Sequence, residues 1–367
     1  MTQRVFWFLA VLATTQGSPR TTPLPPPNAS IDAEFTRIVG IRELADGRVL
    51  VADAGDRKLY VADFPTQRVS VIGREGGGPG EYRNVGQLFA LAGDSTLLVD
   101  VQGGRWLLLR GAEIVQTVVA DAPALRDGYR NPSGADAAGF IIASRLMGAP
   151  NGPSVELPRQ DSSHLFRVSR SSGRVDTIAA LQARPARIQT AGPRGQPTSI
   201  SITTNPLAAG DLTAMFADGA VAIARVNPYR VDWILANGGR VVGSPLPFTR
   251  VPVTEREKNA VMMRQAARSG RGPAAPGSID DWPEVIPPFL TGALLAAPDG
   301  RLWIRRTPTA QVPETIYDVV DRNGKVAARL TMSPNEAIAG IGRTMLYSLV
   351  TDDDGVQRLR RHPLRTQ

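Results

Sequence analysis

The chain has 367 residues, of which 42% are hydrophobic and 21% charged, so it is long enough to bury a large core and too apolar to be disordered. The absence of cysteine excludes disulfides, thiolate metal sites and a cysteine nucleophile. The net charge of +8 comes from dispersed arginines without a compact basic stripe, so we expect no nucleic-acid partner.

The N-terminus is typical of an export signal. Arg4 precedes an apolar run over residues 5–13, which is too short to cross a bilayer, where about 20 residues are needed. We predict a signal peptide over residues 1–17 and an extended, mobile proline-rich leader over residues 18–30, and therefore an exported protein, periplasmic or secreted. A frayed apolar N-terminus on a cytosolic protein is the alternative. We expect a monomer without a transmembrane segment.

Residues 31–367 contain six copies of one pattern, in which short strands are separated by tight turns that contain Asp-Gly or an isolated glycine. The copies occupy residues 38–72, 85–119, 132–180, 213–243, 291–330 and 336–364. Four antiparallel strands per copy correspond to one propeller blade. We therefore predict an all-β, six-bladed β-propeller with one short helical insertion. The alternatives are an irregular β-sandwich or a propeller of five or seven blades.

The sixth copy has only three strands before the chain ends. We predict that residues 31–38 supply the fourth strand and close the ring, which would hold both termini and remove an exposed sheet edge. Strong hairpin signals are expected to join third strands to fourth strands at Ser172-Gly173, Asn237-Gly238 and Asn323-Gly324.

The longer connections are expected on one face of the disc, because the tight turns take up the other. They are residues 145–163, 182–212, 245–290 and 306–314. The insertion at 245–290 carries the capping-box pattern Thr254-Glu255-Arg256-Glu257, which predicts a helix that ends before Gly270. This helix would be either a lid or an element packed on a neighbouring blade, and the loop 270–277 after it is expected to be mobile. Functional residues gather on such loops, so this face is the predicted functional face.

A candidate ligand site follows from counting about six residues from each first turn. The count reaches equivalent positions where the second strand emerges on the long-loop face: Asp53, Asp100, Arg145, Arg225, Arg306 and Ser348. Such a ring would bind a polar or anionic ligand through its arginines. The alternative is that Asp53 with Arg57 and Asp100 with Arg105 hold their own loops.

The segments 45–53 (ADGRVLVAD) and 73–82 (GREGGGPGEY) resemble bacterial six-bladed propeller proteins related to the NHL-repeat and TolB-like groups. The segment 299–304 (DGRLWI) resembles a later blade of the same kind. The resemblance implies the fold only, since such propellers include binding scaffolds, lactonases and lyases.

No catalytic constellation is visible, because the chain has only two histidines and no Gly-X-Ser-X-Gly motif. We therefore expect a non-catalytic extracytoplasmic scaffold without cofactor, which recognises a small polar ligand, a peptide or an envelope partner on the long-loop face. The alternative is a calcium-type metal-dependent hydrolase or lactonase resembling gluconolactonase, with Asp53 and Asp100 as metal ligands. The arginines at equivalent positions of later blades would oppose such a cation.

Overall fold

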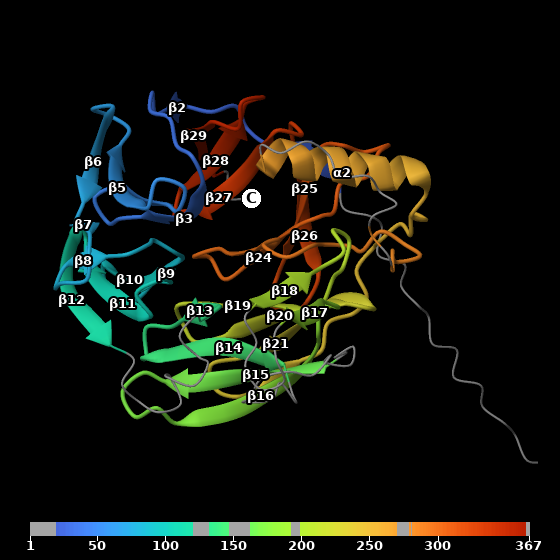
Figure 1. Ribbon diagram of the computed structural model, residues 1–367, viewed down its shortest axis with the longest axis horizontal. Coiled ribbons are helices and arrows are strands. Elements are labelled where there is room, and N and C mark those ends of the chain that lie inside the picture. The colour runs from blue at the N-terminus through green and yellow to red at the C-terminus, as the bar shows by residue number, and fades with distance from the viewer. Residues whose placement is uncertain are drawn as a thin grey trace, which may run out of the picture.

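The computed structural model describes residues 20–119, 132–146, 162–191, 199–269, 279 and 281–364. Its main sheets radiate from a central axis as six blades of a propeller (Figure 1). In each blade one continuous segment of the chain runs outward from the axis as successive antiparallel strands, and the N-terminal segment adds an outer strand to each of the last two blades. The predicted fold class is confirmed.

The first three blades contain the following strands. The first blade consists of β3 (Ile38–Glu43), β4 (Val49–Asp53), β5 (Lys58–Asp63) and β6 (Arg68–Ile72). The second consists of β9 (Leu88–Ala90), β10 (Ser95–Asp100), β11 (Arg105–Arg110) and β12 (Glu113–Val119). The third consists of β13 (Gly134–Ala135), β14 (Phe140–Leu146), β15 (Ser162–Ser169) and β16 (Val175–Gln182).

The last three blades repeat this order. The fourth consists of β19 (Leu212–Met215), β20 (Val221–Val226), β21 (Tyr229–Ile234) and β22 (Arg240–Val241). The fifth consists of β23 (Leu294–Ala296), β24 (Leu302–Arg305), β25 (Thr315–Val320) and β26 (Val326–Met332). The sixth consists of β27 (Glu336–Ile341), β28 (Met345–Thr351) and β29 (Gln357–Pro363), completed by β2 (Ala29–Ser30).

The hydrophobic core lies between neighbouring blades, because both faces of each sheet are covered by the next sheet in the ring. Leu50 and Leu59 of the first blade pack with Leu98 and Leu107 of the second. Second strands are accordingly almost continuously apolar; every residue of β4 is buried. Burial on both faces explains why these strands do not alternate hydrophobic and polar residues.

The innermost strands approach one another so closely that two of them require glycine. A Cβ at Gly40 of β3 would lie 3.1 Å from the backbone nitrogen of Leu88 in β9, and one at Gly340 of β27 would lie 2.9 Å from the side chain of Ile41. Both glycines coincide with a register shift between the first and second strands. The absence of a side chain at these positions lets the inner wall close.

The N-terminal segment closes the ring, but not with the residues predicted. The pairing strand is β2, which runs antiparallel to β29, and of residues 31–38 only Ile31 and Phe35 form backbone hydrogen bonds with that strand. The preceding segment is extended as predicted but is held in place rather than mobile: β1 (Thr21–Pro23) pairs in parallel with β26 of the fifth blade. The predicted signal peptide lies outside the described residues.

The connections are segregated between the two faces as predicted. First-to-second and third-to-fourth strands are joined by short turns, which include the three predicted hairpin turns. The described parts of the longer connections lie on the opposite face, here called the long-loop face. They carry the strand pair β7 (Arg74–Glu75) and β8 (Glu81–Tyr82), the hairpin of β17 (Arg187–Ala191) and β18 (Ser199–Thr203), and the helix α2 (Glu255–Ser269). In the part of the chain that is described, no helix is long and apolar enough to span a membrane.

Candidate functional site

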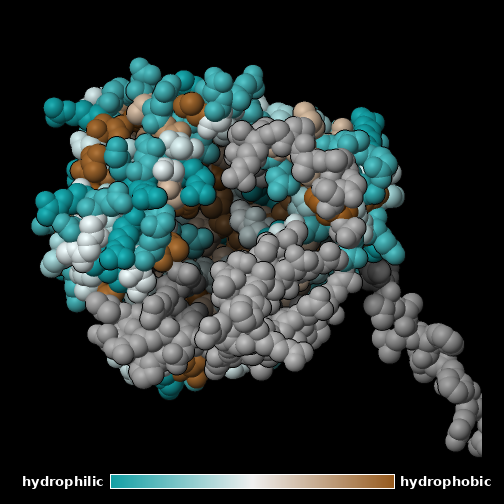
Figure 2. Space-filling view, viewed as in Figure 1, coloured by the Kyte–Doolittle hydropathy of each residue, from teal (hydrophilic) through white to brown (hydrophobic). Residues whose placement is uncertain are grey.

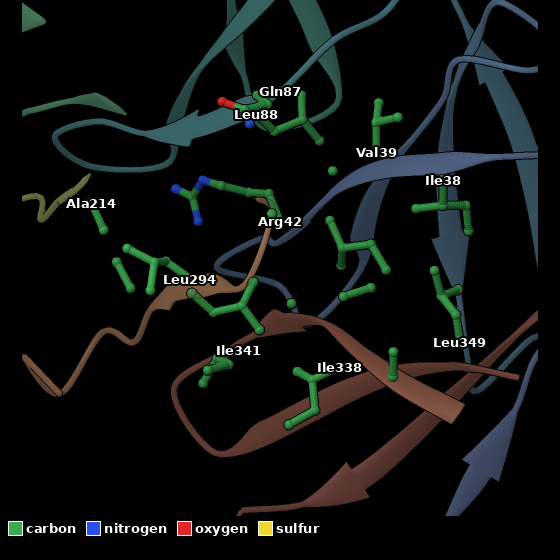
Figure 3. Close-up of a pocket in the computed structure, with 18 of the residues that line it drawn as sticks. Ile38, Val39, Arg42, Gln87, Leu88, Ala214, Leu294, Ile338, Ile341 and Leu349 are labelled. Atoms are coloured by element: carbon green, nitrogen blue, oxygen red, sulfur yellow. The ribbon is translucent and has the colours of Figure 1, made fainter. Parts of the chain in front are cut away.

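A cavity of about 1310 Å³ follows the axis of the propeller and is bounded by the innermost strands. Figure 2 shows the hollow at the centre of the disc, with hydrophobic residues on its wall. Its middle is apolar: Val39, Leu88, Ala214, Leu294 and Ile338 come from five different blades and line it (Figure 3). Ring closure therefore creates a large chamber, with apolar side chains in its middle, from strands that are individually short.

At the short-turn end the charged groups of the cavity wall are already paired. The Arg42 guanidinium donates to Thr96 Oγ1 at 3.1 Å and to the Glu43 carbonyl at 2.6 Å, and it lies 3.8 Å from the Asp94 carboxylate. Burial lowers the pKa of Arg42 and Asp94 opposes this shift. Arg42 thus joins the first and second blades, and most of its bonding capacity is used within the wall.

On the long-loop face the helix α2 lies beside the fifth blade (Figure 1). Both carboxylate oxygens of Glu257 accept the Ala310 amide, at 3.0 and 2.8 Å, and Arg264 Nη2 donates to the Pro308 carbonyl at 3.1 Å. Glu257 therefore binds the 306–314 connection instead of completing the predicted capping box. The helix, predicted with nearly correct bounds, is packed on a neighbouring blade, and Arg264 reaches the mouth of the axial cavity.

A second cavity of about 170 Å³ adjoins this mouth. Its lining combines three arginines with a threonine and three prolines: Arg264, Arg305, Arg306, Pro308, Pro313, Thr315 and Pro334. Four of these residues, Arg264, Arg305, Thr315 and Pro334, also line the axial cavity, so the two spaces adjoin at shared walls. We call this space the arginine pocket.

The three arginines of the arginine pocket differ in how their charge is balanced. Arg306 is 3.4 Å from the buried Asp318 carboxylate and donates to the Pro247 carbonyl at 3.2 Å. Arg264 has a carbonyl partner, and burial lowers its pKa while the Glu257 carboxylate opposes that shift. The Arg305 guanidinium is half-buried and makes no hydrogen bond or ion pair with the described residues.

The two aspartates of the predicted ring are structural in this arrangement. Asp53 is fully buried and accepts the backbone amides of Thr36, Arg37, Gly55 and Asp56 at 2.7–3.2 Å. Asp100 is also fully buried and occupies the same place in the second blade. It accepts the amides of Arg83, Asn84 and Gly103 and is bound by Arg105 Nε at 3.1 Å.

Arg225 and Arg306, two further positions of the ring, are each bound to aspartates of their own blade. Arg225 bridges Asp211 and Asp232 at 2.8 Å each, and Arg306 binds Asp318 as described above. Arg145 lies in β14 opposite His164, and its side chain is outside the described part of the structure. No hydrogen bond or ion pair between two of the six predicted residues occurs among the described side chains.

Ser348, the sixth predicted position, belongs to a buried polar cluster. Its hydroxyl lies 2.6 Å from Glu336 Oε1 and 2.8 Å from His362 Nε2, while His362 Nδ1 lies 2.8 Å from the Pro25 carbonyl. Ser348 and His362 are at most 2% exposed, so a substrate has no access to this serine. The cluster instead fixes the N-terminal segment to the sixth blade.

The metal-dependent alternative requires several ligands at one place. Asp53 and Asp100 lie in different blades, and their oxygens are used by backbone amides. Among the described residues no group of three or more histidine, cysteine, aspartate or glutamate side chains is placed to hold a metal ion. The donor sets around these two aspartates therefore do not fit a calcium site.

The cavity-lining residues Val39, Arg264 and Arg305 were not identified from the sequence. Innermost strands such as β9, with three residues, are too short to show a periodic pattern. Arg305 directly precedes the predicted Arg306, so counting from the turn reached the same strand end but selected the arginine that is paired with Asp318.

Comparisons with known proteins extend only to the fold. No protein-family model matches the chain, and no curated protein matches its sequence. Virginiamycin B lyase from Staphylococcus aureus is 10% identical, with 92% of this chain and 99% of that chain covered and a TM-score of 0.43. The PQQ-bound aldose sugar dehydrogenase from Streptomyces coelicolor is 11% identical, with 94% and 99% covered and a TM-score of 0.44. The calcium-binding protein regucalcin from Agrobacterium tumefaciens is 13% identical, with 94% and 100% covered and a TM-score of 0.37.

Proposed function

We propose that the protein is an exported, non-catalytic binding propeller that takes a small molecule into its axial cavity from the long-loop face. The ligand has an apolar body, which fills the chamber, and a polar end at the mouth. The observation that carries this proposal is a cavity of about 1310 Å³ whose apolar middle opens toward incompletely paired arginines at one end.

The axial cavity shares an apolar middle and a few polar groups with small-molecule sites, and its volume lies above their usual range. Ligand pockets are typically about 300–1,000 Å³, mostly apolar, and contain a few polar groups that fix orientation. At the short-turn end Arg42 is bonded to the wall, whereas at the long-loop end Arg305 has no partner among the described residues. This difference between the two ends supports a ligand that enters the axial cavity with its apolar body first, so that its polar end remains at the mouth on the long-loop face.

A small ligand is better supported than a peptide or an envelope partner, because the cavity is enclosed by a ring of strands rather than spread over an outer surface. Export, the monomeric state and membership of the NHL-repeat or TolB-like groups remain part of the proposal. They rest on the N-terminal sequence and on the motifs around Gly47 and Gly300.

Filling the chamber tests the proposal. Val39 projects into the axial cavity with 38% of its surface exposed, so Val39→Trp adds an indole there without disturbing the core between blades. We expect this variant to bind the neutral fluorescent probe N-phenyl-1-naphthylamine at least about tenfold more weakly than the parent protein does, because the indole occupies the probe's volume. Fluorescence titration measures the affinity, and thermal unfolding shows whether the variant is folded.

The matched control is Val71→Trp, in the outer strand of the same blade. Val71 is 51% exposed and does not line the cavity, so this variant should bind the probe as the parent protein does. Equal probe binding by folded Val39→Trp and Val71→Trp proteins, or no binding by the parent protein, would contradict the proposed function.

A further inference from the structure

We infer that the arginine pocket is an anion subsite, which receives a carboxylate or phosphate group of the ligand on Arg305 and Arg264. The inference rests on the proposed function and specifies its ligand class. The ligand is an organic anion whose apolar body lies in the axial cavity and whose charged group lies beneath α2.

The local charge around the arginine pocket favours an anion. Four guanidinium groups, those of Arg264, Arg305, Arg306 and Arg329, lie in or behind the arginine pocket. The carboxylates that face them are Glu257 and Asp318. Arg329 Nε donates to Asp318 Oδ1 at 2.7 Å, and Arg306 Nη1 lies 3.4 Å from Asp318 Oδ2. Positive charge is therefore in excess. Arg264 and Arg305, which also border the axial cavity, have no described carboxylate at ion-pair distance.

Arg264 is held in a fixed position. Its Nη2 is bonded to the Pro308 carbonyl, and seven residues earlier on the same helix Glu257 binds the Ala310 amide with both oxygens. Two points of α2 are thus fixed to one connection of the fifth blade. A guanidinium held in this way is preorganised and loses little conformational freedom when a ligand binds.

The size and lining of the arginine pocket suit a single anionic group. A volume of about 170 Å³ suits one charged group rather than a whole molecule, and no carboxylate lines it. Three prolines, Pro308, Pro313 and Pro334, form part of its wall and offer no backbone N–H. Hydrogen bonds to an anion would therefore come from the arginines and from Thr315. Guanidinium forks match the geometry of carboxylate and phosphate oxygens.

The test compares an anionic and a neutral probe with the same apolar chain. Octanoate and octyl phosphate supply the two anions, and 1-octanol supplies the neutral counterpart. Isothermal titration calorimetry is carried out on the full chain and on Arg305→Gln and Arg264→Gln. Arg301→Gln, in the turn that leads into the same strand, is the control for Arg305→Gln, because Arg301 is paired with Asp299 on the short-turn face. Arg256→Gln is the control on α2, since Arg256 does not line either cavity.

We expect Arg305→Gln to weaken octanoate or octyl phosphate binding about tenfold or more, and Arg264→Gln to act in the same direction, because each removes a charge-assisted contact. Binding of 1-octanol should change less than about twofold, since its contacts are apolar. The anion that binds more tightly to the parent protein identifies the carboxylate or the phosphate as the natural group. The two controls should leave every affinity unchanged.

Three outcomes would overturn the subsite. The first is unchanged anion binding in both pocket variants, and the second is an equal loss in Arg301→Gln, which would indicate a general effect of net charge. The third is binding of 1-octanol without any preference for the anions. In each of these cases, binding of N-phenyl-1-naphthylamine to the parent protein and to Val39→Trp still tests the axial cavity. The proposed function is therefore tested separately from the anion subsite.

Discussion

Asp53 and Asp100 show how one buried carboxylate can organise a blade. Each binds two backbone amides of the segment that leads into the first strand, residues 36–37 for Asp53 and residues 83–84 for Asp100. Each also binds amides of the loop that follows its own strand. The carboxylate therefore connects the inner strand of its blade to the second strand on the long-loop face, which positions the cavity wall.

Removal of this carboxylate should destabilise the fold strongly. We expect Asp53→Ala to lower the free energy of unfolding by about 3 kcal/mol or more, because four backbone amides lose a buried acceptor and each unsatisfied group costs about 1–3 kcal/mol when water cannot replace it. Urea unfolding measures the change. Asp63→Ala is the control, since that carboxylate accepts the Thr66 hydroxyl at an exposed turn. A loss of less than about 1 kcal/mol for Asp53→Ala would contradict this role.

Sequence reasoning captured part of this role and missed the rest. The pairing of Asp100 with Arg105 is confirmed at 3.1 Å. The pairing of Asp53 with Arg57 is wrong, because Arg57 lies 3.2 Å from Glu75 instead. Asp53 still holds its own loop, but through the backbone amides of Gly55 and Asp56. It also accepts the amides of residues 36 and 37, which precede the first strand, and no local sequence pattern reveals that second pair of hydrogen bonds.

Among the elements, the N-terminal segment is the one whose role differs most from expectation. β1 extends the fifth blade and β2 completes the sixth, so residues 20–30 cross the outer edges of two neighbouring sheets. The Leu24 amide binds the Thr331 carbonyl, and the Asn28 amide binds the Arg361 carbonyl, each at 2.9 Å. Between them the Pro25 carbonyl binds buried His362. The segment thus joins the last two blades before the chain begins the first.

Removing this segment should weaken ring closure. A chain that starts at residue 31 is expected to lose about 3 kcal/mol of unfolding free energy relative to a chain that starts at residue 20, because several backbone hydrogen bonds of about 1 kcal/mol each disappear and two sheet edges are exposed. Urea unfolding of the two chains gives the difference. Equal stability would show that the segment is only an attached tail.

Turn chemistry explains which elements were predictable. Asn237-Gly238 and the other hairpin turns specify their structure locally; Gly238 has φ of 85°, a conformation that glycine adopts readily. β1 could not be predicted in the same way, because Thr21–Pro23 pairs with Arg329–Thr331 at the other end of the chain. The proline-rich composition correctly indicated an extended segment but carried no information about its partner.

On the scale of the whole molecule, the cavity arises from assembly rather than from any one segment. Val39, Leu88 and Leu294 face a common space only after six blades have closed around the axis. Blade number, strand order and the face that carries the longer loops were therefore accessible from repeats and turns, whereas the residues that line the cavity were not. The sequence does not distinguish Arg305 from Arg306, because only the structure shows that the buried Asp318 pairs with Arg306.

The response of the whole fold to pH follows from its carboxylates. The described carboxyl groups with a resolved pKa shift, namely Asp46, Glu81, Asp232, Glu336 and Asp352, all have a lowered pKa in the folded protein. For Asp232 burial alone would raise the pKa, but the guanidinium groups of Arg230 and Arg225 outweigh it. For Glu336 burial is likewise outweighed, by polar contacts with His362 and Ser348 and by the charges of His362 and Arg360.

The sign of the resulting pH dependence is therefore fixed. A carboxyl group whose pKa is lowered by folding binds fewer protons in the folded than in the unfolded chain. It therefore stabilises the fold at pH values above its ordinary pKa, 3.8 for aspartate and 4.5 for glutamate. This stabilisation is lost as the pH falls through the pKa of the folded state. Acidification also adds to a net charge that is already +8, and the self-repulsion acts in the same direction. We expect the urea midpoint to fall steadily below about pH 4.5, and Glu336→Gln to show a shallower fall because one of the shifted groups is removed. A midpoint that rises on acidification, or an unaltered slope in folded Glu336→Gln protein, would contradict this assignment.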